Sequence, residues 1–158
     1  MKTNRIVFGF LMMGLLATLG VTHTQAHRRG SVSDGQHLEG SWVLTATIEG
    51  EPLIHALITF SRDGSFIETA AAPGVSTGHG TWVRTGNRKF ALTNVYLRLG
   101  DMGEFIGTSK VRANFDLTES LEEGNGRFQT NVFDADGNEV DSFGGTAHAQ
   151  RIQSEPLE

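Results

Sequence analysis

The chain has 158 residues, a formal net charge of −5 and no cysteine. A length of this order suits one domain with a single hydrophobic core. The acidic balance, with lysine and arginine scattered along the sequence, argues against nucleic acid or an anionic membrane as a partner. The lack of cysteine excludes disulfides, thiol chemistry, cysteine-ligated zinc and iron–sulfur clusters.

The first 26 residues have the pattern of a secretory signal peptide. Lys2 and Arg5 precede the apolar run of residues 6–19, and Thr24-Gln25-Ala26 has the small residues of a cleavage site. The apolar run is shorter than the roughly 20 residues that span a bilayer, so we expect no stable membrane insertion. We therefore expect a secreted or periplasmic protein. Residues 27–39 are charged and lack periodicity, which predicts a flexible leader.

The folded domain is expected over residues 40–153, followed by a C-terminal tail at 154–158. Apolar and polar residues alternate after Gly40, and short runs of strand-forming residues, separated by turns, recur to the end. The predicted strands cover residues 42–48, 53–61, 65–71, 81–85, 89–99, 105–117, 127–133 and 140–152. This pattern predicts an all-β fold, a single antiparallel up-and-down β-barrel of about eight strands, with a two-sheet sandwich as the alternative.

Three glycine-containing stretches are expected to interrupt the strands. Residues 72–80 are predicted to form the longest loop, at one mouth of the barrel, and residues 122–126 a hairpin turn. Gly144-Gly145, inside the last predicted strand, indicates a bulge or a sharp bend.

Gly40-Ser41-Trp42, directly before the first strand, resembles the start of lipocalins and of the wider calycin barrels. The resemblance implies that an arginine near the last strand packs over the tryptophan at the closed end of the barrel, and Arg151 is the matching residue. The roles implied for Trp42 and Arg151 are structural. A guanidinium can stack on an indole face while it donates hydrogen bonds to carbonyls at the strand ends.

A barrel of about eight strands encloses its own side chains or one small ligand. The leading hypothesis is that the interior binds a small hydrophobic or amphipathic molecule without covalent chemistry and without a cofactor. The residues expected to line this site are Leu44, Ile58, Phe66, Trp82, Tyr96, Val111, Phe115 and Phe128.

Two alternatives remain at this point. One is a small barrel cyclase or isomerase, similar to allene-oxide-cyclase-like or dirigent-like barrels, with Glu68, Tyr96 and His79 as candidate catalytic residues. A buried Glu68 with a raised pKa could act there as an acid or base. The other alternative is a structural or interaction barrel filled by its own side chains.

Both faces of residues 89–99 carry apolar side chains, so alternation does not decide which face points inward. We favour the outward orientation for Glu68, Asn94 and Tyr96, because charged residues are seldom fully buried without a partner. Arg84 is a further polar candidate if the opposite orientation holds.

No metal site is expected. Asp134, Asp136 and Asn138 place oxygens at alternate positions, but Gly137 does not stand where a calcium-binding EF-hand needs its glycine, and a hairpin turn explains the pattern. The histidines of the folded part are far apart and form no metal-binding motif.

Overall fold

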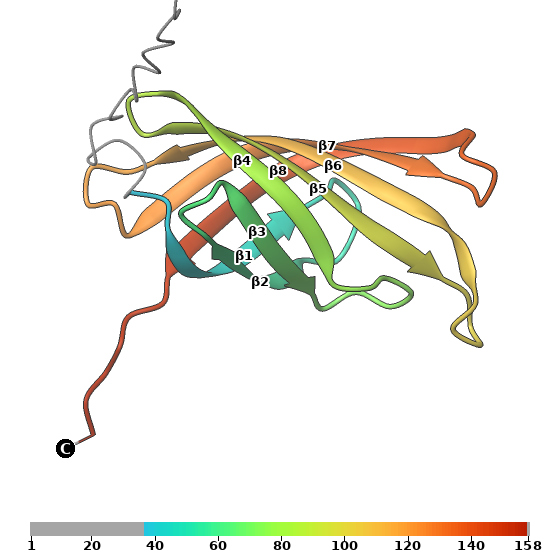
Figure 1. Cartoon of the computed structure of the whole chain (residues 1–158), viewed down its shortest axis with the longest axis horizontal. Helices are drawn as coiled ribbons and strands as arrows, with labels where there is room; N and C mark the ends of the chain where they lie inside the picture. The colour runs from blue at the N-terminus through green and yellow to red at the C-terminus, as the bar shows by residue number, and fades with distance from the viewer. Residues whose placement is uncertain (1–36, 158) are drawn as a thin grey trace, which may run out of the picture.

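The computed structural model describes residues 37–157, so the predicted signal peptide at 1–26 lies outside the described residues. Eight strands follow one another in chain order and close into an antiparallel up-and-down barrel (Figure 1), which confirms the predicted fold class. β1 and β8 close it by pairing from Trp42 with Arg151 to Thr47 with Thr146. The strands are β1 (Gly40–Thr47), β2 (Ile54–Phe60), β3 (Ser65–Ala70), β4 (Gly78–Gly86), β5 (Lys89–Leu99), β6 (Phe105–Leu117), β7 (Glu123–Phe133) and β8 (Glu139–Arg151). Residues 37–157 contain no helix long and apolar enough to cross a membrane.

The strands on the two sides of the barrel differ in length. β5 and β7 have 11 residues and β6 and β8 have 13, whereas β1, β2 and β3 have 8, 7 and 6. At one end, β5 to β8 project beyond the shorter strands (Figure 1). We call this the open end; it carries the connections that follow β1, β3, β5 and β7. The opposite end, where β1 begins and β8 ends, is the closed end.

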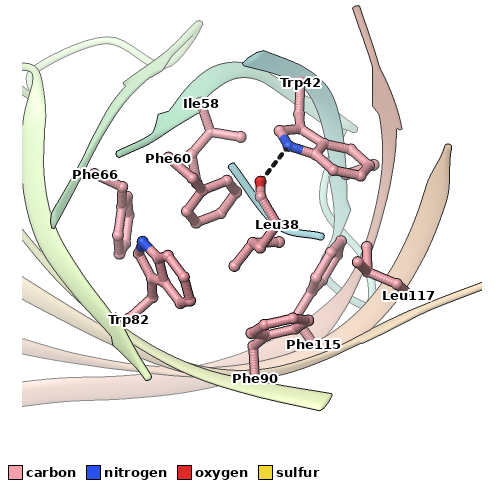
Figure 2. Packing of buried hydrophobic residues seen from close by; sticks show 10 residues of the cluster. Leu38, Trp42, Ile58, Phe60, Phe66, Trp82, Phe90, Phe115 and Leu117 are labelled. Carbon is pink, nitrogen blue, oxygen red and sulfur yellow. Dashed lines mark hydrogen bonds between the residues drawn. The ribbon is translucent and has the colours of Figure 1, made fainter. Parts of the chain in front are cut away.

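Aromatic and aliphatic side chains fill the closed end. Leu38 and Trp42 are fully buried there, and the Trp42 indole Nε1 donates a hydrogen bond to the Leu38 carbonyl oxygen at 3.0 Å. Figure 2 shows the ring of side chains around Leu38. The buried cluster comprises Leu38, Trp42, Ile58, Phe60, Phe66, Trp82, Phe90, Phe115, Leu117 and Ala149. The barrel core therefore begins within the segment predicted as a flexible leader, because Leu38 belongs to it.

Arg151 closes this end over Trp42. Its guanidinium carbon lies 4.2 Å from the centroid of the indole ring. Nη1 and Nη2 donate hydrogen bonds to the carbonyl oxygens of Glu39 and His37, each at 2.5 Å, and Nε donates to that of Leu121 at 3.2 Å. The planar guanidinium thus ties the chain before β1 and the β6–β7 turn to the last strand while it stacks on the indole.

Two strands are longer than the glycine content predicts. β4 starts at Gly78 and β7 at Glu123, inside the stretches that we expected to be a loop and a turn. The glycines face inward and lie against large side chains: a Cβ at Gly126 would come within 3.1 Å of the Phe115 ring. Glycine in these strands makes room for neighbouring rings and does not end the strand. The predicted loop at 72–80 and turn at 122–126 are wrong in extent for this reason.

The expected bulge at Gly144-Gly145 is also absent from the pairing. Both glycines pair regularly with β7, and the irregularity lies near the open end, between Val132 and Phe133. A Cβ at Gly145 would come within 2.8 Å of the Phe128 ring, so this glycine accommodates an aromatic side chain of the adjacent strand.

Candidate functional site: an interior cavity with one carboxylate

The barrel interior between the closed-end cluster and the open end holds a cavity of about 240 Å³. For comparison, an apolar cavity of about 150 Å³ in another protein admits benzene. The cavity reaches Ile48, Ala72 and Val75, which lie in the connections at the open end. Of the predicted lining residues, the structure brings together around it Leu44, Ile58, Phe66, Tyr96, Val111, Phe115 and Phe128.

Trp82 is the exception. It does not border the cavity but packs edge-on against Phe60 and Phe90 in the closed-end cluster, and its Nε1 donates to the Ser61 carbonyl oxygen at 3.1 Å. Alternation correctly indicates that Trp82 points inward. It carries no information about the height of a residue along the barrel axis, and Trp82 lies close to the β4–β5 turn at the closed end.

Small side chains create the space. Ala46, Ala56, Ala113 and Ala147 face the cavity from four different strands, where larger residues would fill it. None of them is among the predicted site residues. The sequence signal that could have found them is the placement of alanine, glycine or serine at inward positions in the middle of a strand, as in β6.

One polar cluster interrupts the apolar wall. Glu68 from β3 borders the cavity together with Asn94 and Tyr96 from β5. Asn94 is only 3% exposed and Tyr96 only 7%. Asn94 Nδ2 donates to Glu68 Oε2 at 2.9 Å, and the Tyr96 hydroxyl is hydrogen-bonded to the same carboxyl group. The outward orientation that we favoured for these three residues is therefore wrong. Glu68 has no charged partner, which was the reason to expect exposure, but two neutral hydrogen-bond donors on β5, the next strand but one, replace it.

β4 leaves room for this cluster. Gly78 lies between Glu68 and the inward face of β5, and a Cβ there would come within 2.5 Å of Asn94 Nδ2 and 2.7 Å of Tyr96 Cε1. Any other residue at position 78 would have to displace these two side chains. The glycine that suggested a loop is thus part of what positions the polar side chains of the cavity.

The cluster shifts the protonation equilibria of its members. Burial raises the pKa of the Glu68 carboxyl, and hydrogen bonds from Tyr96 and Asn94 lower it in part. The pKa of Tyr96 is raised as well, mainly by burial and then by the negative charge of Glu68. Tyr96 therefore remains a protonated hydrogen-bond donor at neutral pH, and Glu68 is an acceptor whose ionised form is disfavoured by burial.

Glu68→Gln is expected to stabilise the barrel increasingly as the pH rises above about 4, where carboxyl groups of an unfolded chain ionise. Between the ordinary pKa of glutamate and the raised pKa of Glu68, the folded wild type binds more protons than the unfolded chain. Its free energy of unfolding therefore falls as the pH rises through this window, by at most about 1.4 kcal/mol per pH unit, and glutamine avoids this loss. Urea unfolding at a series of pH values measures the difference.

The control for this series is Glu51→Gln, an exposed residue in the β1–β2 connection. It is expected to change the free energy of unfolding by no more than about 0.5 kcal/mol throughout. If the stability advantage of Glu68→Gln over the wild type, measured as free energy of unfolding, stays constant or shrinks as the pH rises, the pKa of Glu68 is not raised in the folded protein.

The structure separates the other two polar candidates from the cavity. His79 is exposed on the outer face of β4, between Ile67 of β3 and Val95 of β5. Arg84 lies toward the closed end, where its Nε donates to the Gly86 carbonyl oxygen at 2.8 Å. Neither residue borders the cavity, so of the three candidate catalytic residues only Glu68 and Tyr96 lie together.

The aspartates of the β7–β8 connection form a hairpin turn. Asp134 Oδ1 accepts hydrogen bonds from the backbone nitrogens of Asp136 and Asn138 at 3.0 and 2.8 Å. Bonds from the Asn138 side chain and then its backbone lower the pKa of the Asp134 carboxyl. Within residues 37–157, no three histidine, cysteine or acidic side chains are grouped as metal ligands would be.

Comparison with known proteins gives a fold neighbour and no family. No protein-family model and no curated protein sequence matches the chain. Among solved structures, the chain is similar to a redesigned β-barrel, with a TM-score of 0.45 and 16% sequence identity. The similarity covers 76% of this chain and 95% of that one. A likeness of this degree carries no argument about function.

Proposed function

We propose that this protein is an exported, lipocalin-like barrel that binds one small, predominantly apolar molecule in its interior without covalent chemistry. The observation that carries the proposal is the cavity of about 240 Å³, which lies beside a filled closed end. Ligand sites in proteins are typically apolar concavities with a few polar groups that orient the ligand. Glu68, Asn94 and Tyr96 supply such groups on one wall.

The closed end supports the choice of a binding barrel over a filled structural one. A barrel that serves only as a scaffold has no need of small residues such as Ala56, Ala113 and Ala147 facing a common space. Here the large side chains gather at one end and leave the other half of the interior open. The stacking of Arg151 on Trp42 supports a likeness to calycin barrels, and the pattern of residues 1–26 supports export to the periplasm or the medium.

Tyr96 offers a direct test of binding, because it is the single tyrosine of the chain and borders the cavity. Protein labelled with fluorotyrosine gives one fluorine resonance that reports on the cavity. Native mass spectrometry of protein purified from its own host should show a bound small molecule, and removal of that molecule should shift the resonance. Protein that carries nothing, and whose resonance no apolar probe shifts, would contradict the proposal.

The contact between Glu68 and Tyr96 inside the cavity favours a second candidate, a cyclase or isomerase that shapes a reactive substrate. Burial raises the pKa of Glu68 toward the range in which a carboxyl group transfers protons near neutral pH. Tyr96 would hold the carboxyl group in place. This candidate requires that a substrate found in the cavity is turned over and that Glu68→Gln lowers kcat; unchanged turnover would exclude Glu68 as its acid or base.

A further inference from the structure

The charge inside the cavity is unbalanced. Within the described part of the chain, Glu68 is the single acidic residue that lines the cavity, and no lysine, arginine or histidine lines it. The other ionisable lining residue, Tyr96, is a neutral donor. Burying a carboxylate without a positive partner is costly, and here the two hydrogen bonds from neutral groups are the compensation that residues 37–157 provide.

The carboxyl group has acceptor capacity left for a ligand. An ionised carboxylate can accept about four hydrogen bonds, and the structure gives this one two donors. The Asn94 carbonyl oxygen Oδ1 is already occupied by the backbone nitrogen of Val95 at 3.0 Å. A ligand group that approaches the cluster from the cavity therefore meets a carboxyl group with free acceptor sites, set in an otherwise apolar wall.

The connections at the open end are acidic, while Arg98 of β5, which pairs with Val75 of the β3–β4 connection, places a positive charge beside them. The connections 48–53 and 71–77 border the cavity, whereas 100–104 and 134–138 lie at the ends of the longer strands β5 to β8; none of the four contains lysine, arginine or histidine. Their acidic residues are Glu49, Glu51, Asp101, Glu104, Asp134 and Asp136. An excess of acidic residues near a concave entrance raises the local concentration of cationic ligands.

We propose that the ligand is a hydrophobic amine, with its apolar body against the alanine and phenylalanine wall and its ammonium group on the Glu68 carboxylate. The proposal rests on the proposed binding function and specifies the chemical class that the cavity selects. Ammonium is the complementary donor for a carboxylate, and such charge-assisted hydrogen bonds are roughly twice as strong as neutral ones. A carboxylic acid of the same shape places a second acidic group against Glu68 in the cavity.

The test compares octylamine, octanol and octanoate, three probes that share a chain and differ in the head group. Titration at pH 7 into fluorotyrosine-labelled protein follows the resonance of Tyr96. We expect octylamine to bind about tenfold or more tightly than octanol, the gain typical of a hydrogen bond to a charged group, and octanoate to bind least. In Glu68→Gln, octylamine should fall to the affinity of octanol, whose own affinity should not change.

Two further variants make the outcome decisive. Glu49→Gln combined with Glu51→Gln, at exposed positions of the entrance, should slow the association of octylamine and leave that of octanol unchanged. Glu123→Gln, exposed on β7 near the closed end, is the control and should affect neither probe. Equal affinities of the three probes, or an octylamine affinity that survives Glu68→Gln, would overturn the amine proposal while leaving the binding function intact. If no probe shifts the Tyr96 resonance, the binding function itself fails.

Discussion

Replacing Trp42 by alanine is expected to lower the free energy of unfolding by about 3–5 kcal/mol, the range seen when a large aromatic core residue is truncated. Trp42 is fully buried and meets the Phe115 ring edge-on, with centroids 6.3 Å apart. The substitution also removes the hydrogen bond to the Leu38 carbonyl oxygen and the surface on which Arg151 stacks. The chain before β1 thereby loses one of its attachments to the closed end and keeps those that Arg151 makes to Glu39 and His37. Urea or guanidinium unfolding of the purified domain measures the effect.

Val43→Ala is the matched control for this experiment. Val43 follows Trp42 in the same strand but points outward and is 45% exposed, so its truncation should cost less than about 1 kcal/mol. Arg151→Lys keeps the positive charge, but lysine cannot donate to three carbonyl groups from one plane. Its loss of free energy of unfolding should lie between those of Trp42→Ala and Val43→Ala. A Trp42→Ala protein as stable as Val43→Ala would show that the closed end does not depend on the indole.

Ala147→Phe is expected to weaken ligand binding by about a hundredfold or more, equivalent to roughly 3 kcal/mol of binding free energy, because the new ring occupies the cavity. Ala147 borders the cavity from β8, and its neighbours across the strands are the small residues Ala46 and Gly126. The ring therefore has the open interior as its nearest free space. Overpacking of cores typically costs about 1–3 kcal/mol, which sets the expected limit on the loss of folding stability.

Thr146→Phe is the control, since it places the same ring one residue earlier in β8, on the exposed outer face. Titration of a bound probe by fluorine resonance or calorimetry should show an affinity near that of the wild type. If Ala147→Phe binds as tightly as Thr146→Phe while both remain folded, the ligand does not occupy the cavity.

The strands could be predicted where local pattern and turn chemistry agree. The expected bounds of β5 and β6 are those of the structure, because both strands are long and the connection between them, residues 100–104, contains two glycines. Taking glycine as the sign of a turn or loop gives the wrong start for β4 and β7. Gly78 and Gly126 are strand residues that accommodate side chains from adjacent strands, and local sequence does not distinguish such a glycine from one that forms a turn.

For the candidate site, too, the sequence predicted some features and could not predict others. Nearly all of the residues that alternation predicted for the lining do line the cavity, because an apolar face of a barrel strand points inward. It could not place Trp82 along the barrel axis, and it could not orient Glu68, since both faces of β5 are compatible with burial. The orientation depends on Asn94 and Tyr96, which reach Glu68 only when β3, β4 and β5 lie side by side.

The amino-acid sequence by itself determined an all-β fold of antiparallel strands, because period-two alternation and frequent turns are typical of strands and not of helices; it favoured a barrel over a sandwich, and the structure shows the closed barrel. The resemblance of Gly40-Ser41-Trp42 to the start of calycin barrels also pointed to Trp42 and Arg151 as partners at one end. Only the tertiary structure decided which half of the interior is filled, where the cavity lies and that it contains a carboxylate. These properties arise from the register of eight strands, which sets the height of each side chain along the axis, and no local pattern encodes that register.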